Sequence, residues 1–220
     1  MNRGERNYVV RSVSAEQVVK IDGKGGDPAW DRAEEMTDFS FPWKSDQPPA
    51  TSFRALRNGE RFYFLFEVVD ADVVLGKAGD LYEQVTRSDR VEIFFTTSDS
   101  LDRYYCLEID PRKKVHDYEA RFYRQMNRGW KCAGLEVAAI RTATGYVVEG
   151  SLPLTTLREL GCVHSGESGL EELKAGVFRA EFSHGPGDEV IENWISWIDP
   201  EIEKPDFHIP GTFGVMVLEP

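Results

Sequence analysis

An alternation of apolar and polar residues with a period of two runs through much of the chain and limits what it can fold into. In the nonapeptide RFYFLFEVV at Arg61–Val69, every second residue from Phe62 to Val68 is apolar and falls on one face. Successive side chains of a strand point to opposite faces, so this pattern predicts a strand buried on one side. Val91–Thr96 alternates in the same way and predicts a second strand.

Further segments carry strand patterns and are separated by turn signals such as Asn58-Gly59 and Thr144-Gly145. These segments are Tyr8–Val13, Thr51–Leu56, Arg103–Ile109, Leu135–Thr142, Tyr146–Leu152, Val177–Ser183, Asn193–Trp197 and Thr212–Leu218. Many short strands with recurrent turns predict an all-β fold, an antiparallel β-sandwich of jelly-roll type. We expect one domain over residues 1–220, with residues 1–19 as an N-terminal extension that carries an edge strand.

Helical patterns are scarce in this sequence. Leu154–Leu160 follows Pro153 and precedes Gly161, which are the usual start and stop signals of a short helix. Gly79–Arg87 is the second candidate. Two short helices cannot cover a parallel sheet, so Rossmann and TIM-barrel architectures are excluded. The polar stretch Ser165–Lys174 is expected to be a surface excursion.

The charge balance excludes partners without naming one. The chain has 38 Asp and Glu against 26 Lys and Arg, a net charge of -12. Such a chain repels phosphate backbones and anionic lipid, so we expect no nucleic acid partner and no membrane insertion. No apolar stretch follows Met1–Arg6, so no signal peptide is expected in this chain. The oligomeric state stays open.

Sequence motifs of catalysis and metal binding are missing. The chain has no GxxxxGK[ST], no GxGxxG and no GxSxG motif, and its four histidines never stand at metal-ligand spacing. Its three cysteines are too few and too scattered for a disulfide framework, so buried thiols are expected. Asp99 and Asp102 share one loop, which leaves a structural calcium site open, although no cofactor is required.

Several charged and aromatic residues fall on strand faces that point away from the expected core. They are Glu67, Arg90, Glu92, Tyr104, Cys106, Glu108, Glu149, Arg179 and Glu181. If their strands are neighbours, these residues form either a solvated outer face or a shallow polar groove. Such a groove suits sugars, because carboxylates and guanidinium groups bind vicinal hydroxyls while an aromatic plate takes the C–H face of the ring. The loop aromatics available for that plate are Trp43, Tyr82, Trp130 and Phe207.

The same glutamates leave a second function open, which is glycoside hydrolysis rather than binding alone. That reaction needs two carboxyl groups about 5–5.5 Å apart for retention, or about 6.5–9.5 Å apart for inversion. Nothing in the sequence marks Glu67, Glu92 or Glu108 as a buried acid. A non-catalytic binding protein is therefore favoured over an enzyme.

The order of several short motifs resembles carbohydrate-binding module family 9 and the wider group of DOMON-like β-sandwiches. The motifs include IDG at Ile21–Gly23, DPAW at Asp27–Trp30, SDRVEIFF at Ser88–Phe95, GYVVE at Gly145–Glu149 and ISW at Ile195–Trp197. The resemblance runs from about Lys20 to Glu219. It implies a distorted jelly-roll sandwich that binds plant-type polysaccharide or oligosaccharide and holds structural calcium in some members. It also implies a role in glycan degradation and an extracellular or periplasmic location.

The resemblance also implies a site. Glu92 matches the family's sugar-binding glutamate, and Phe207 lies near the second of two tryptophans that enclose a terminal sugar. The family's first tryptophan, its arginine and its asparagine are replaced here by Thr86, Cys106 and Lys204. Tyr82 or Trp130 is expected to supply the missing plate, and Arg90 or Arg103 the missing cation. The predicted sugar-binding residues are therefore Phe207, Glu92, Tyr82, Arg90, Tyr104 and Trp130.

A third class follows from the same resemblance, because related DOMON-like sandwiches bind haem through a methionine and a lysine or histidine. The candidate axial ligands here are Met126, Met216, His116 and Lys131. Met216 alternates with Val215 and Val217, which is typical of an ordinary core position.

Overall fold

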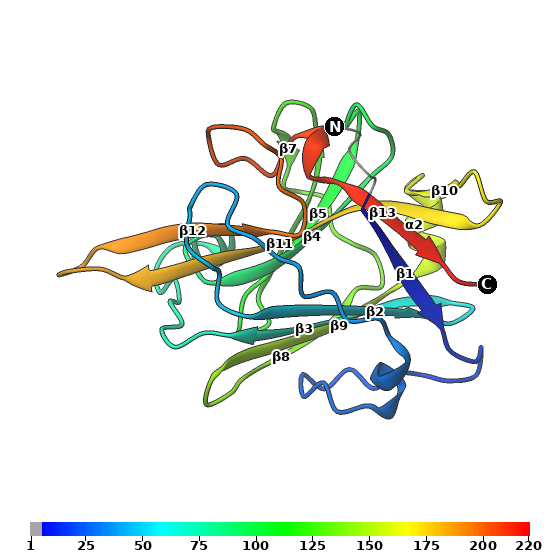
Figure 1. Ribbon diagram of the computed structural model, residues 1–220, viewed down its shortest axis with the longest axis horizontal. Helices are drawn as coiled ribbons and strands as arrows, with labels where there is room; N and C mark the ends of the chain where they lie inside the picture. Colours follow the sequence, from blue (N-terminus) through cyan, green and yellow to red (C-terminus); the bar gives the residue numbers. More distant parts are fainter. Residues whose placement is uncertain (1–5) are drawn as a thin grey trace.

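The computed structural model describes residues 6–220 and confirms an all-β sandwich with two short helices (Figure 1). The strands are β1 (Asn7–Ser12), β2 (Thr51–Arg57), β3 (Arg61–Val69), β4 (Arg90–Thr96), β5 (Tyr104–Ile109), β6 (Val115–Arg121), β7 (Gln125–Asn127), β8 (Glu136–Arg141), β9 (Gly145–Pro153), β10 (Val163–Ser165), β11 (Glu171–His184), β12 (Val190–Ser196) and β13 (Gly214–Leu218). The helices are α1 (Leu81–Thr86) and α2 (Leu154–Glu159). Within residues 6–220, no helix has the length and apolar character needed to cross a membrane.

The strands form two layers that β1 joins. One layer has the order β7-β6-β5-β4-β11-β13, the other has the order β2-β3-β9-β8, and β10 and β12 pair with β11. Residues 7–10 of β1 pair with β13 and residues 11–12 with β2, both in parallel. β1 therefore stands at the edge of each layer as it crosses from one layer to the other. These two parallel pairings are also exceptions to the antiparallel arrangement predicted from the sequence.

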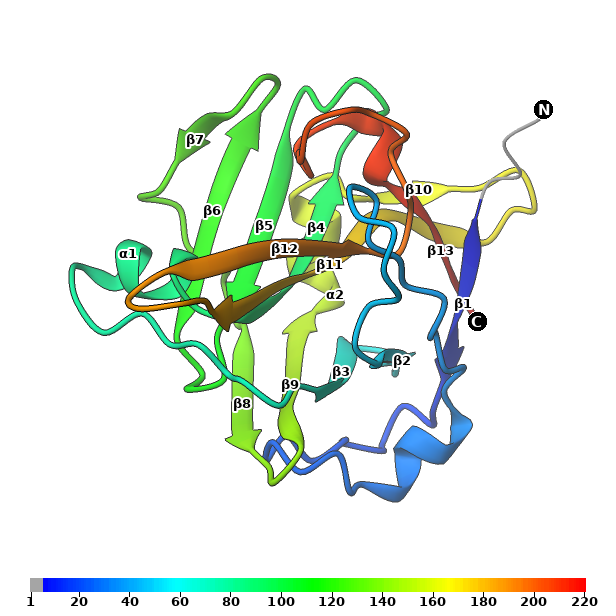
Figure 2. The ribbon, with the colours of Figure 1, turned by 60° about the vertical axis from the view of Figure 1, so that its left-hand side comes forward.

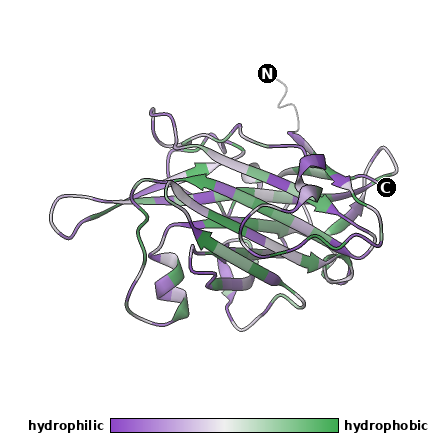
Figure 3. Cartoon of the chain, turned by 90° about the horizontal axis from the view of Figure 1, so that it is seen from below, coloured by the Kyte–Doolittle hydropathy of each residue, from purple (hydrophilic) through white to green (hydrophobic). Residues whose placement is uncertain are grey.

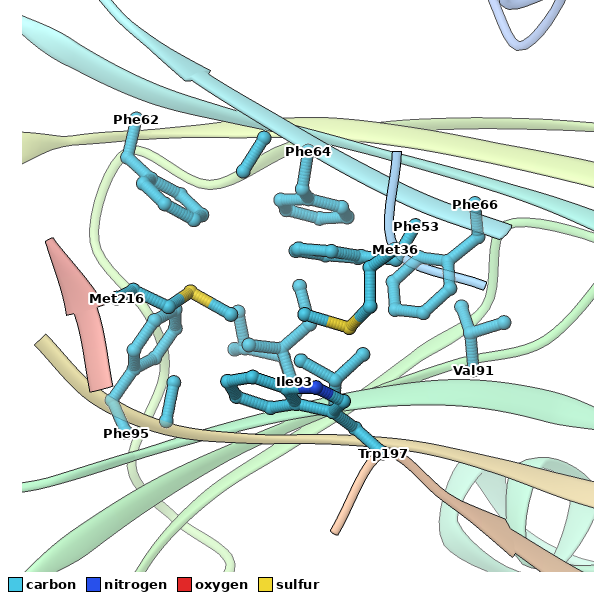
Figure 4. Close-up of a cluster of buried hydrophobic side chains, with 14 of the residues drawn as sticks. Met36, Phe53, Phe62, Phe64, Phe66, Val91, Ile93, Phe95, Trp197 and Met216 are labelled. Carbon is cyan, nitrogen blue, oxygen red and sulfur yellow. The ribbon is translucent and has the colours of Figure 1, made fainter. Parts of the chain in front are cut away.

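The hydrophobic core fills the space between the two layers (Figure 4). The alternating phenylalanines of β3, from Phe62 to Phe66, are fully buried there and face Ile93 and Phe95 of β4. The Phe62 and Phe95 rings meet edge to face with centroids 5.9 Å apart. Figure 3 shows the alternation of apolar and polar residues along the strands from which the sandwich was predicted.

The predicted surface excursion at Ser165–Lys174 is wrong in its second half. Strand β11 begins at Glu171, and Leu173 is fully buried opposite Met216 of β13. The alternation was hidden because Leu173 stands between Glu172 and Lys174 and is the only large apolar residue of residues 171–174.

Residues between β1 and β2 cover the outer face of the second layer. Glu149 of β9 is fully buried beneath them and accepts hydrogen bonds from the backbone N–H of Asp22 at 3.0 Å and from Trp30 Nε1 at 3.1 Å. Glu149 is thus off the main core, as expected, but it is not part of any open groove. The contact gives the IDG, DPAW and GYVVE motifs one physical role, which is to fasten the N-terminal segment onto β9.

Candidate functional site

A pocket of about 210 Å³ opens on the outer face of the first layer, between β4, β5 and β6 and the chain segments around them. Its floor follows from strand register. Glu92 of β4 stands opposite Glu108 of β5, and Glu108 stands opposite His116 of β6. Since directly opposite residues of antiparallel strands point to the same face, these three side chains form one row across the sheet. Figure 2 shows the sheet from β4 to β7 with α1 and β12 beside it.

Arg90 holds the two glutamates of this row together. Its Nε lies 2.8 Å from Glu92 Oε1 and 3.0 Å from Glu108 Oε2, and all three side chains are buried. The Arg90 Nη1 donates to the carbonyls of Thr86 and Ser88 at 3.1 and 3.3 Å, which fixes the guanidinium below α1. The floor is therefore a buried cluster of one cation and two carboxyl groups.

The floor also gathers polar atoms that have no hydrogen-bond partner. Six such buried side-chain atoms occur within residues 6–220, and four belong to residues that line this pocket. The four are Arg90 Nε, Glu92 Oε1, Glu108 Oε2 and His116 Nε2. The first three atoms form ion pairs with one another, but their angles are too poor for hydrogen bonds. His116 Nε2 forms no ion pair and no hydrogen bond. Buried polar atoms are normally hydrogen-bonded, so His116 Nε2 is left able to form one further polar contact.

Burial changes the protonation of these groups. It raises the pKa of Glu92 well above its usual value, an effect that Glu108 reinforces and Arg90 opposes. Burial lowers the pKa of His116, so its imidazole is neutral near pH 7. Burial also lowers the pKa of His208 to about 4, and its Nδ1 lies 3.0 Å from the Tyr104 hydroxyl. The histidines therefore offer neutral donors and acceptors rather than charges.

Aromatic side chains form the walls. Trp43, Tyr82 and Trp194 are half-buried and line the pocket. Phe207 is only 5% exposed, and one face of its ring is stacked on Phe178 with centroids 4.1 Å apart. The Trp43 and Trp194 rings each lie 5.8 Å from the Phe207 ring. Phe207 thus supports the wall, while the two tryptophans present more of their surface to the opening.

The rim is set by a second ion pair. Arg124 Nη2 donates to Asp206 Oδ1 at 2.8 Å, and the Tyr123 hydroxyl donates to Asp206 Oδ2. Burial alone would raise the pKa of Asp206, but the hydrogen bonds from Tyr123 and His208 N–H and the charge of Arg124 hold it below its usual value. Arg124 and Asp206 both line the pocket. The rim therefore carries a fixed, charge-paired edge.

The structure brings four of the six predicted site residues to this pocket. Phe207, Glu92, Tyr82 and Arg90 line it. Tyr104 points to the same side of the sheet but is fully buried behind His208. Trp130 does not reach the site, because its ring packs 4.9 Å from that of Tyr105, which faces the main core.

The replaced family positions are also distributed unevenly. Thr86 lines the pocket, whereas Cys106 is fully buried under the sheet's outer face and Lys204 is exposed away from the lining. Of the two expected cations, Arg90 is in the floor, whereas Arg103 forms an ion pair with Glu119 at 2.9 Å outside the pocket. Arg124 supplies a second cation that the sequence reasoning did not single out.

Two further expectations about off-core faces need correction. Arg179 lies on the inner side of β11, where it is fully buried and pairs with Asp70 at 3.1 Å. Glu67 lies on the other layer and pairs with Arg54, so it cannot join the groove. Alternation places a residue on one of two faces, but it does not say which layer that face belongs to.

Strand β6 supplies site residues that sequence reasoning missed. It contributes His116 and Tyr118, and the Tyr118 hydroxyl donates to Glu108 Oε1 at 2.8 Å. The segment VHDYEAR was not predicted as a strand, because its outward residues are polar site residues rather than apolar ones. The signal that could have found it is the position of this segment after the Asp110-Pro111 turn, which continues the hairpin pattern. The other missed lining residues are Met126, Trp194, Pro205, Asp206 and His208.

The candidate metal ligands lie apart from one another in the described part of the chain. Within residues 6–220, no three His, Cys, Asp or Glu side chains gather where they could hold a metal ion. Asp99 contacts Lys174, and Asp102 accepts hydroxyl hydrogen bonds from Ser98 and Ser100. The cysteines are free thiols, with Cys106 and Cys162 buried and Cys132 half-buried.

The haem ligand candidates are divided between the core and the pocket. Met216 is fully buried in the main core, and Lys131 Nζ pairs with Asp117 at 2.6 Å. Met126 and His116 do line the pocket, but two carboxyl groups form its floor. This pocket of about 210 Å³ has a polar, ion-paired floor, which does not fit the broad apolar plane of a haem.

Comparisons with known proteins agree with this architecture. A candidate carbohydrate-binding protein from Bacteroides uniformis is similar over 98% of this chain and all of that chain, with a TM-score of 0.73 and 19% identity. A carbohydrate binding module family 9 from Caldicellulosiruptor kristjanssonii is similar in its complexes with cellotriose and with glucose, with TM-scores of 0.61 and 0.60 and 16% identity. These two matches cover 97% of this chain and 94% and 96% of those chains. At such identities the likeness shows the fold alone.

A search of curated proteins found no match. The family model described as carbohydrate family 9 binding domain-like matches residues 21–220, which include both layers of the sandwich and the pocket. The chain therefore belongs to the carbohydrate family 9 binding domain-like family.

Proposed function

We propose that the pocket binds one pyranose ring of a neutral oligosaccharide or polysaccharide, without cleaving it, and that this binding serves glycan degradation. The single observation that supports this most is the floor, where the Arg90, Glu92 and Glu108 ion pairs and the unpartnered His116 Nε2 converge beneath aromatic walls. A sugar ring has the matching chemistry, with hydroxyls around its edge and C–H groups on its faces. The complexes of the Caldicellulosiruptor kristjanssonii module with glucose and cellotriose support neutral pyranoses as the ligand class.

In the proposed mode, the ring hydroxyls enter the floor. Glu92 and Glu108 accept hydrogen bonds from adjacent hydroxyls, while His116 Nε2 pairs with a third. Arg90 keeps the two carboxyl groups near one another, so little ordering is needed when the sugar arrives. Paired contacts of this kind favour vicinal hydroxyls of defined orientation.

The tryptophan walls would then take the apolar faces of the ring. Trp43 is held in place because its Nε1 donates to the Ile202 carbonyl at 2.8 Å. Trp194 is packed edge to face on Phe182 at 5.6 Å and on Phe207 at 5.8 Å. The stacking surface is thereby assigned to the two tryptophans, with Phe207 behind them. Exposed contacts of about 1 kcal/mol each give micromolar to millimolar affinity.

Calorimetric titration with neutral mono-, di- and trisaccharides tests this function. We expect saturable binding by the parent and a loss of about tenfold or more in affinity for Trp43→Ala. Trp130→Ala is the matched control, since Trp130 is also a half-buried tryptophan but packs on the opposite side of the sheet. A parent that binds no sugar, or a Trp43→Ala variant that binds as tightly as Trp130→Ala, would contradict the proposal.

Glycoside hydrolysis is the second candidate, because two carboxyl oxygens share Arg90 Nε at 2.8 and 3.0 Å. This closeness resembles the carboxyl pairing of a retaining glycosidase. However, the buried Arg90 side chain fills the space between the two carboxyl groups, where hydrolysis would need the glycosidic bond. Release of reducing sugar by the parent, abolished in Glu92→Gln, would establish hydrolysis; binding without release supports the non-catalytic function.

A further inference from the structure

We infer that the β6–β7 turn carries an outer subsite, in which Phe122 and Tyr123 stack against the sugar unit next to the one in the pocket. This inference rests on the proposed function and adds a second contact to it. An outer subsite would make the protein bind an oligosaccharide more tightly than a single sugar. The occupant is the neighbouring ring of the same neutral oligosaccharide.

Exposure is the first observation. Phe122 and Tyr123 are 49% and 51% exposed, and within residues 6–220 no other aromatic side chain is classed as exposed. Two adjacent aromatic rings left in water cost free energy, so such a pair usually marks an interaction site. The Phe122 and Tyr123 centroids are 5.5 Å apart with their planes inclined at 67°, which presents two differently oriented apolar surfaces.

Attachment to the pocket is the second observation. The Tyr123 hydroxyl donates to Asp206, and Arg124 lies over the Tyr123 ring at 5.6 Å from its centroid. Asp206 and Arg124 both line the pocket. The aromatic pair is therefore joined directly to the pocket wall by the hydrogen bond from Tyr123 to Asp206. A sugar chain that leaves the pocket on this side would pass over the two rings.

The backbone of the turn is held independently of any ligand. The Phe122 N–H donates to the Leu101 carbonyl at 3.0 Å, and β7 pairs with β6 on the far side of the turn. The rings are thus displayed from a fixed support, which lowers the ordering cost of binding. Their chemistry suits the C–H face of a pyranose and gives no reason to prefer a charged ligand.

The test compares ligands of different length on one variant. The parent is titrated with mono-, di- and trisaccharides of glucose, xylose, mannose and galactose, beside Phe122→Ala and the control Ile140→Ala. Ile140 is an exposed apolar residue on β8, in the other layer. Thermal unfolding of each variant checks that it is folded.

We expect the parent to bind the disaccharide about threefold to tenfold more tightly than the monosaccharide of the same sugar. Phe122→Ala should lose this gain and keep the monosaccharide affinity, while Ile140→Ala should match the parent. If Phe122→Ala loses the same affinity for saccharides of every length, or loses none, the outer subsite is overturned. The proposal for the pocket would then still stand. A parent that binds none of these sugars overturns both.

Discussion

Arg90 and Glu92 lie two residues apart on β4, with Arg90 Nε 2.8 Å from Glu92 Oε1, and both are buried at the floor of one pocket. A buried ion pair contributes little to stability, since desolvation offsets much of its attraction. Its place at the base of an aromatic-walled pocket gives it a different role, which is to hold polar atoms ready for a ligand.

Replacing Glu92 by glutamine is expected to weaken sugar binding by about twofold to tenfold, because an amide NH₂ donor replaces one acceptor oxygen and a hydrogen bond contributes about 0.5–1.5 kcal/mol. Titration with the sugar that the parent binds most tightly measures this. Glu67→Gln is the matched control, since Glu67 pairs with Arg54 on the other layer and is 45% exposed. Equal affinities of the two variants would show that Glu92 does not contact the sugar.

Glu149→Gln is expected to reduce the free energy of unfolding by about 1–3 kcal/mol. The buried side chain of Glu149 accepts hydrogen bonds from N–H groups, and the glutamine amide is a weaker acceptor. The donors are the Asp22 backbone and Trp30 Nε1. Denaturant titration measures the change, with Glu67→Gln again as the control. A variant as stable as the control would mean that this contact does not fasten the N-terminal segment.

His208 should make stability fall in acid. Burial lowers its folded-state pKa to about 4 from an ordinary value of 6.5, so the unfolded chain binds more protons between these limits. The His208 contribution is therefore complete above pH 6.5 and is lost as the pH falls towards 4. Relative to His208→Gln, the parent should lose about 1.4 kcal/mol for each pH unit in this window. A difference that does not vary with pH would contradict a buried neutral imidazole.

Asp89 should give stability the opposite pH dependence to that expected from His208. It is fully buried at the start of the SDRVEIFF motif, and burial raises its pKa to about 7, while backbone N–H donors from Phe182 and Val74 oppose the shift. The folded state then binds more protons than the unfolded state between its ordinary value of 3.8 and about 7. Stability of the parent relative to Asp89→Asn should therefore fall as the pH rises through this window. A relative stability that rises with pH would show that Asp89 stays ionised.

Sequence patterns predicted the sandwich because burial on one side leaves a direct trace in alternation. Arg61–Val69 was predicted with the observed bounds, and the helix at Leu154 was predicted to within one residue. The parallel pairing of β1 left no such trace, because alternation reports which face is buried and not which strand lies alongside.

The site was only partly predictable for a related reason. Arg90 and Glu92 stand on an outer strand face and Tyr82 on helix α1, and all three predicted residues line the pocket. Trp130 was placed wrongly, since a loop aromatic can fold back onto either side of a sheet. His116 was named as a haem ligand and not as a sugar-site residue, because the polar residues that make β6 part of the site also removed its strand signal.

The indole N–H resonances of the five tryptophans provide the most direct test of the central claim, which is that the pocket binds a neutral sugar. Trp→Phe variants assign each resonance in a ¹H–¹⁵N spectrum, and the parent is then titrated with the tightest-binding saccharide. The account predicts that Trp43 and Trp194 shift and saturate together, while Trp30, Trp130 and Trp197 stay in place. No shift with any saccharide, or shifts confined to Trp30 or Trp130, would contradict it.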